Sequence, residues 1–194
     1  MPYAVGLHPG FALDWQAGEH RFRFAEEERA EVPVIASGGL FSSRHRPVPM
    51  RGRALALSPD LFAAEALCFL NTRARHFALE GPHGRLRIEA PDFPHLILWN
   101  RMDGPYLAIE SWTGTGDLED FEGSFFERPS MIHLEPGDRL EPSRRQPVLL
   151  KPHRQVIVGK IRILVADDHA IIRKGFRFVI QQQEDIEVIG EAAD

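Results

Sequence analysis

The chain is poor in the residues that cross-link or anchor proteins. It has one cysteine among 194 residues, Cys68, which excludes an intramolecular disulfide and a cysteine-based zinc site. The neighbours of Cys68 are apolar, which predicts a buried structural thiol and fits a reducing compartment. No apolar run approaches the roughly 20 residues that cross a bilayer, and the N-terminus lacks the basic and apolar regions of a signal peptide. We therefore expect a cytoplasmic protein with no membrane partner.

The chain also lacks an excess of positive charge. Its formal net charge is -5, which gives no basic field to hold nucleic-acid phosphates. We interpret the short basic patches, Arg44–Arg46 and Arg144–Arg145, as solvated surface and expect no nucleic-acid partner. Hydrophobic residues make up 43% of the chain and charged residues 26%, as in ordinary globular proteins.

Most of the chain has the pattern of β-structure. Alternating apolar and polar residues predict half-buried strands over residues 21–24, 51–57, 85–89 and 131–134. The runs 95–99 and 106–112 are almost wholly apolar and predict strands buried on both faces. One short helix is expected over residues 59–70, with its apolar side formed by Leu61, Phe62, Ala66 and Phe69. This spacing favours a mostly β protein with a large β-sandwich.

The pattern changes near Pro152. Residues 148–150 read as a last strand of the first region, and we expect a domain over residues 1–152 followed by a linker over 153–160. Residues 161–166 form a compact apolar strand, and another strand begins over 186–189. Between them, apolar residues recur at helical spacing at Ile172, Phe176, Val179 and Ile180. Residues 161–194 are therefore predicted to form a β-α-β unit.

The chemistry of the first region centres on His8 and Glu110. Pro9 and Gly10 fix a bend directly after His8, which presents its imidazole at a strand end. Alternation in the run 106–112 places on one face the residues Tyr106, Ala108, Glu110 and Trp112. A carboxylate between two aromatic side chains in an apolar strand indicates either a functional group or a structural ion pair. One alternative is purely structural, in which Glu110 pairs with an arginine and His8 caps a turn.

Five segments, in order, resemble the C-terminal half of the aldose 1-epimerase (galactose mutarotase) family, especially its bacterial LacX-like branch. They are Gly6–Phe11, Ser58–Phe62, Leu98–Asn100, Pro105–Asp117, and Phe126–Pro129 leading to Leu134–Asp138. The resemblance covers residues from about 1 to 140. It implies a partial galactose-mutarotase-like β-supersandwich.

The same resemblance implies a cofactor-free exchange of the α and β anomers of a hexose or hexose phosphate through the open-chain aldehyde. By this resemblance, His8 matches the general acid that protonates the ring oxygen, and Glu110 matches the general base that takes the proton of the C1 hydroxyl. The exchange needs both groups at once, and burial tunes their pKa values. The candidates for an apolar wall around the sugar are Phe11, Trp99, Tyr106 and Trp112.

The chain begins just before the His-Pro segment, so the resemblance also implies that the N-terminal half of the family is absent. A sandwich without those strands exposes apolar edges and faces. We therefore expect a homodimer or a complementing N-terminal fragment as partner. Arg44 and His45 are candidates for the missing sugar contacts, although a solvated loop is the simpler interpretation.

Residues 161–175 and 185–192 resemble the start of a response-regulator receiver domain of the NarL/FixJ type. The resemblance implies that Asp167 and Asp168, at the end of the first strand, form a Mg²⁺ site, because hard carboxylate oxygens suit that ion. The family's phosphorylated aspartate and its DNA-binding domain would lie beyond Asp194. We therefore expect a truncated receiver fragment with a weak metal site, or alternatively a hydrated acidic turn.

Three functions remain open at this point. The first is a mutarotase-like isomerase with an appended receiver fragment. The second is a non-catalytic module that binds carbohydrate or a signalling partner, through a surface that includes Ile172 and Phe176. The third is a chimeric reading frame with no selected function.

Overall fold

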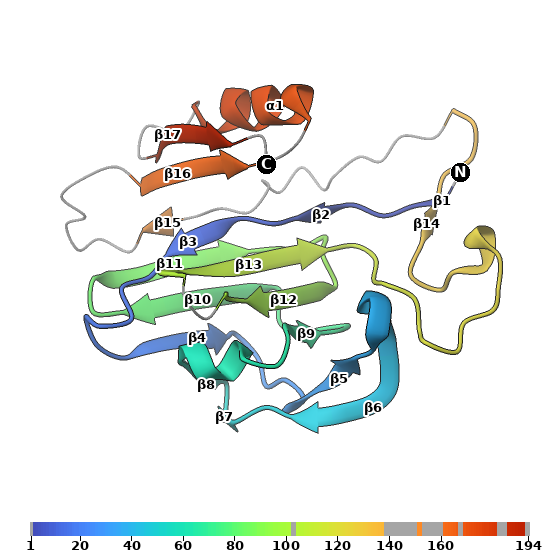
Figure 1. Ribbon diagram of the computed structural model, residues 1–194, viewed down its shortest axis with the longest axis horizontal. Coiled ribbons are helices and arrows are strands. Elements are labelled where there is room, and N and C mark those ends of the chain that lie inside the picture. The colour runs from blue at the N-terminus through green and yellow to red at the C-terminus, as the bar shows by residue number, and fades with distance from the viewer. Residues whose placement is uncertain are drawn as a thin grey trace. The chain divides into compact units, whose positions relative to one another are not determined.

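The computed structural model describes residues 2–101, 104–137, 151–152, 161–166, 169–181 and 186–192 (Figure 1). The chain divides into two compact units, Met1–His153 and Arg154–Asp194. The first unit is almost wholly β-structure, and the second contains a helix between two strands. The chain is therefore mostly β, as the sequence predicts.

One sheet of the first unit has six strands in the order β15-β11-β10-β4-β8-β7, and every neighbouring pair is antiparallel. The strands are β4 (His20–Phe24), β7 (Met50–Arg51), β8 (Ala54–Leu57), β10 (His76–Gly81), β11 (Gly84–Glu89) and β15 (Lys151–Pro152). The alternation that predicts a strand over residues 51–57 is interrupted. Gly52 has a φ of 58°, which a glycine adopts without strain, and the chain turns there to form the β7–β8 hairpin.

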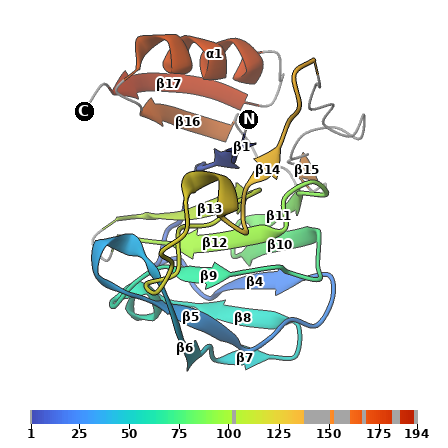
Figure 2. The same cartoon turned by 90° about the vertical axis from the view of Figure 1, so that its right-hand side faces the viewer.

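The second sheet has five strands in the order β2-β13-β12-β9, and β3 also pairs with β13. Figure 2 shows β13, β12 and β9 side by side in this order. The strands are β2 (Gly6–Leu7), β3 (Gly10–Ala12), β9 (Leu67–Phe69), β12 (His95–Trp99) and β13 (Tyr106–Trp112). Both apolar runs of the sequence, 95–99 and 106–112, are therefore strands.

The expected helix over residues 59–70 is wrong. A single 3-10 turn covers Pro59–Phe62, and Leu67–Phe69 is strand β9, which pairs with β12. The reason is tertiary, because all three residues of β9 are buried and β12 supplies the hydrogen bonds that a helix would have made.

The two sheets pack face to face around one apolar core. Phe22 and Leu55 of the six-stranded sheet and Leu98 and Leu107 of the five-stranded sheet are fully buried in it. Phe24 and Phe69 join the sheets with ring centroids 5.0 Å apart. Each sheet therefore keeps one face for the core and turns the other away from it.

Smaller elements complete the first unit. They are β1 (Pro2–Tyr3), which pairs with β14 (Ile132–His133), the hairpin of β5 (Glu31–Ile35) and β6 (Phe41–Pro47), and 3-10 turns at Ser37–Gly39 and Phe125–Glu127. The strand predicted over residues 131–134 is therefore present in a shorter form. Residues 148–150, where the sequence predicts a last strand, lie outside the described residues.

The second unit contains β16 (Ile161–Ala166), α1 (Ala170–Ile180) and β17 (Ile186–Ala192). The two strands are parallel, with Ile161 opposite Ile186, so the predicted β-α-β arrangement is confirmed. On α1, Ile171 and Phe178 are exposed, and Phe176 is 43% exposed.

Candidate functional site

Strand β13 presents two different faces. Leu107 and Ile109 lie in the core between the sheets, so the residues that alternate with them face the opposite side of the sheet. Glu110 lies on that opposite side, together with Trp112, as the sequence predicts. The core face of this strand thus fixes where the carboxylate points.

His8 lies where the neighbouring chain is interrupted. Strands β2 and β3 both pair with β13, and His8 and Pro9 form the break between them. Proline has no N–H to give to a ladder, but the Pro9 carbonyl accepts a hydrogen bond from the Ile109 N–H at 3.0 Å. This bond holds the break against β13 and keeps His8 beside Glu110.

His8 and Glu110 are in direct contact. The Nε2 atom of His8 lies 3.1 Å from Oε1 of Glu110. The imidazole side chain is 60% exposed, whereas that of the glutamate is 4% exposed. Among the described residues, the ion-pair partner of Glu110 is His8 and not an arginine. An exposed imidazole therefore contacts a buried carboxylate.

Burial sets the electrostatics of this pair. It raises the pKa of Glu110 from its ordinary value of 4.5 to about 7, and a hydrogen bond from the Trp112 side chain, the smaller cause, opposes this rise. The Oε2 atom of Glu110 is buried and has no hydrogen-bond partner among the described residues. The carboxyl group can thus take or release a proton near neutral pH and has one oxygen free to accept a hydrogen bond.

Aromatic side chains surround the pair. The ring of His8 lies edge to face with Trp99, with centroids 6.2 Å apart, and Trp99 in turn contacts Tyr106. Trp112 is half-buried on the face of Glu110. Phe11, the fourth candidate for an apolar wall, instead belongs to the core between the sheets. Three of the four predicted aromatic residues therefore remain candidates for contact with a ligand.

Cys68 and Glu110 belong to one row across the sheet. Glu110 pairs with Ile97 of β12, and Ile97 pairs with Cys68 of β9. Cys68 is 2% exposed, which confirms the predicted buried thiol. Burial raises its pKa to about 12, and the negative charges of Glu110 and Glu65 add to the effect.

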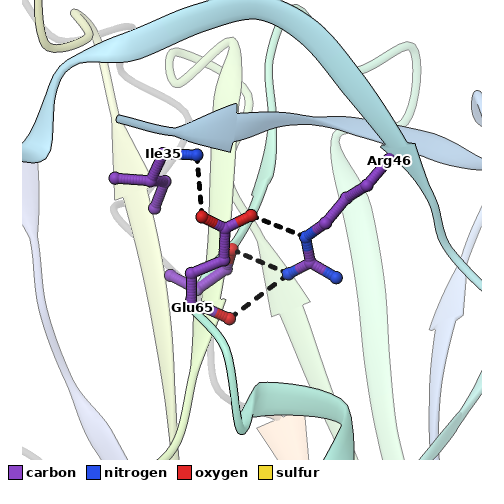
Figure 3. A network of polar contacts seen from close by, with 4 residues as sticks. Ile35, Arg46 and Glu65 are labelled. Carbon is purple, nitrogen blue, oxygen red and sulfur yellow. Dashed lines mark hydrogen bonds and ion pairs between the residues drawn. The ribbon is translucent and has the colours of Figure 1, made fainter. Parts of the chain in front are cut away.

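The β5–β6 hairpin is attached to the sheet near this row. The Glu65 carboxylate accepts hydrogen bonds from the Ile35 N–H and from Nε of Arg46, both at 2.7 Å (Figure 3). Nη2 of Arg46 donates to the Glu65 and Ala66 carbonyls. Phe41 of β6 packs against Cys68 in a small apolar cluster. This network was not predicted from the sequence, because ion pairs between distant segments leave no local pattern.

The contacts of Arg44 and His45 lie within β6. Nε of Arg44 donates to the Ser42 hydroxyl at 3.4 Å, and Nδ1 of His45 lies 3.2 Å from the Ser43 carbonyl. Both residues are exposed. No contact that we find connects them with His8 or Glu110.

Gly6 is a residue near the site that was not predicted from the sequence. Its position two residues before His8 could have indicated that it lies near the site, because residues at this spacing on an extended strand share a face. Gly6 pairs with Trp112 in the sheet, and the indole lies against its bare Cα.

The metal prediction cannot be placed in the structure. Asp167 and Asp168 lie outside the described residues. In the part of the chain that the structure describes, no group of three or more His, Cys, Asp or Glu residues is arranged to hold a metal ion.

The described helices include none that is long and apolar enough to span a membrane.

Comparison with known proteins supports the resemblance of the first unit. No family model matches the chain. The plasmid-encoded protein LacX of Lactococcus lactis is 30% identical over 148 residues, which is 71% of this chain and 49% of LacX. The chain thus spans about half the length of LacX. A 33-residue stretch is 58% identical to the transcriptional regulatory protein YhcZ of Bacillus subtilis and covers 17% of this chain and 15% of YhcZ.

Solved structures give the same result for the fold. A galactose mutarotase-like protein from Lactobacillus casei aligns with a TM-score of 0.63 at 21% identity, over 71% of this chain and 50% of that protein. A galactose mutarotase related enzyme from Lactobacillus acidophilus aligns with a TM-score of 0.61 at 27% identity, over 71% of this chain and 49% of that protein. The short regulator match hints only weakly at a receiver fragment. The part of the chain that these structures cover therefore has a galactose mutarotase-like fold and is similar in sequence to LacX.

Proposed function

We propose that the first unit interconverts the α and β anomers of a hexose or hexose phosphate. The observation that carries this proposal is the contact between His8 and Glu110, at 3.1 Å, on the sheet face that also bears Trp112. An exposed imidazole on a buried carboxylate with a raised pKa is the combination that acid–base chemistry near neutral pH requires.

The chemistry follows from the two groups. Ionised Glu110 takes the proton of the C1 hydroxyl while protonated His8 gives its proton to the ring oxygen. The bond between C1 and the ring oxygen breaks, and the electrons of the O1–H bond form the C1 carbonyl. After rotation about C1–C2, neutral His8 takes the proton back from the hydroxyl and Glu110 returns its own to O1. The reaction is an isomerisation and consumes no oxidant or reductant.

The geometry of the pair suits this substrate. Both reacting oxygens are bonded to C1, so the acid and the base must lie close together. His8 and Glu110 meet this condition, and Oε2 of Glu110 has no protein partner to compete with the C1 hydroxyl. Trp99 and Tyr106 provide apolar surface beside His8 for the face of a sugar ring.

The test is polarimetry of freshly dissolved α-D-glucose and α-D-galactose, with the natural chain and with the variants Glu110→Gln and His8→Asn. We expect acceleration that each substitution lowers by a factor of about 100 or more. Glu31→Gln and His83→Asn, at exposed positions, serve as matched controls, because any free carboxylate or imidazole catalyses this reaction slightly. Equal rates for the site variants and the controls would refute the proposal.

A second candidate function is carbohydrate binding without catalysis, supported by the half-buried aromatic residues Trp99, Tyr106 and Trp112. Ligand-observed NMR with the same sugars separates the two functions. Binding by the natural chain without any acceleration would favour the second function.

We also propose that a partner chain, either a second copy or a separate N-terminal fragment, raises the activity of this chain. The support is that the chain spans about half the length of LacX. For a homodimer, specific activity should rise with protein concentration in step with the dimer fraction measured by sedimentation. Activity that stays proportional to monomer concentration would exclude an activating effect of the second copy.

A further inference from the structure

Gly6 lies in tight contact with the side chain of Trp112. A Cβ atom at this position would lie 2.5 Å from Cδ1 of Trp112, 3.0 Å from its Nε1 and 3.2 Å from its Cγ. Real Cβ atoms do not approach other atoms to 2.5 Å, so the indole occupies the space that any other residue at position 6 would need. The φ of Gly6 is not positive, so the backbone conformation does not require glycine at this position. Glycine is required because the Trp112 indole occupies the space of a Cβ atom.

Trp112 also packs against apolar side chains. It packs against the apolar cluster of Phe41, Cys68 and Ile97. Ile97 lies directly opposite Glu110 in the sheet. The indole is thus held between the backbone at Gly6 and this cluster, on the same face as the carboxylate.

We propose that Gly6 and Trp112 are positioning residues that keep water away from Oε2 of Glu110. The indole lies against Gly6 and makes a side-chain hydrogen bond to Glu110. Oε2 of Glu110 is buried and has no hydrogen-bond partner among the described residues. The catalytic meaning of this arrangement rests on the proposed function, but the arrangement itself is measurable without any sugar.

Few other titratable groups bear on this measurement. Those that face Glu110 among the described residues are His8, from the break between β2 and β3, and Cys68, from β9. The Arg46–Glu65 pair lies further along, beside Cys68. None of them changes when Gly6 is substituted.

The experiment is a titration of the Glu110 carboxyl by ¹³C NMR in a glutamate-labelled chain, with the signal assigned by its loss in Glu110→Gln. In Gly6→Ala the added methyl displaces the indole and admits water. Burial raises the pKa of Glu110 by more than the hydrogen bond from Trp112 lowers it, so we expect the admitted water to dominate and the pKa to fall by about one pH unit. An unchanged pKa in a folded Gly6→Ala protein would overturn the proposal.

Gly10→Ala is the matched control. Gly10 flanks His8 on its other side, and a Cβ atom there would lie 3.7 Å from Cδ2 of Tyr106, an ordinary contact. We expect the Glu110 pKa to stay unchanged in this variant. A fall equal to that in Gly6→Ala would show a general effect of the strand and would also overturn the proposal.

Trp112→Leu completes a double-mutant cycle. Loss of the indole admits water, which lowers the Glu110 pKa, and removes its hydrogen bond, which raises the pKa; because burial is the larger cause, we expect a net fall. Adding Gly6→Ala should then change nothing more, because leucine leaves room for the methyl. If Gly6→Ala does not fold, Trp112→Leu decides alone, and an unchanged pKa there refutes the inference. Absence of mutarotation together with the expected fall in pKa would refute the proposed function but not this inference.

Discussion

The replacement of Glu110 by glutamine should make the stability of the chain less dependent on pH between about 4.5 and 7. Burial holds the pKa of Glu110 at about 7 in the folded protein, against an ordinary value of 4.5. Below pH 4.5 the carboxyl is protonated in both states and its ionisation contributes nothing. Between these values the unfolded chain loses the proton and the folded chain keeps it, so the free energy of unfolding falls as the pH rises. Glutamine cannot ionise, and Glu110→Gln removes this dependence.

The magnitude follows from the two pKa values. Their difference, at about 1.4 kcal/mol for each pH unit, gives at most about 3.5 kcal/mol. The His8 side chain beside Glu110 is 60% exposed, so solvent screens the pair and we expect about half of this value. The stability of Glu110→Gln relative to the natural chain should therefore rise by about 1.5 to 2 kcal/mol between pH 4.5 and pH 8.

The assay is urea denaturation followed by tryptophan fluorescence across this pH range. All three tryptophans, Trp15, Trp99 and Trp112, lie in the first unit, so the signal reports on that unit alone. Glu31→Gln, at an exposed position of β5, is the control and should keep the pH dependence of the natural chain. A constant difference between Glu110→Gln and the natural chain at every pH would refute the reasoning.

Three further predictions concern packing and reactivity. Cys68 is buried and its pKa is raised to about 12, so iodoacetamide at pH 8 should label the native thiol at least about 100-fold more slowly than the urea-unfolded one, as mass spectrometry can measure. Arg46→Ala leaves the Glu65 carboxylate without its cation and should cost about 2 to 3 kcal/mol in urea denaturation. Arg23→Ala, which breaks a more exposed pair, should cost about 1 kcal/mol or less, and equal costs would contradict the role of burial. Leu107→Ala should cost about 2 to 5 kcal/mol, because the side chain is fully buried between the sheets, and a cost below about 1 kcal/mol would contradict that packing.

Local pattern predicted several elements correctly. The alternation in the run 106–112 predicts strand β13 and its two faces, and the change to helical spacing after Ala166 predicts the β-α-β unit. These succeeded because strand and helix periods are properties of the backbone. The helix expected over residues 59–70 failed because β12 offered Leu67–Phe69 a buried edge, a long-range choice that no window of sequence contains.

The candidate site divides in the same way. The sequence by itself determined that Glu110 shares a face with Trp112 and lies opposite Leu107 and Ile109, since side chains alternate along a strand. It also determined that His8 is followed by a break, because Pro9 cannot donate to a ladder.

Only the tertiary structure decided that these two residues meet. The register of β2 and β3 against β13 joins segments from opposite ends of the first unit and brings His8 within 3.1 Å of Glu110. The same packing buries the carboxylate and raises its pKa, and it places the Trp112 indole against Gly6. Burial and register are sums over many distant contacts, so they exist only once the chain has folded.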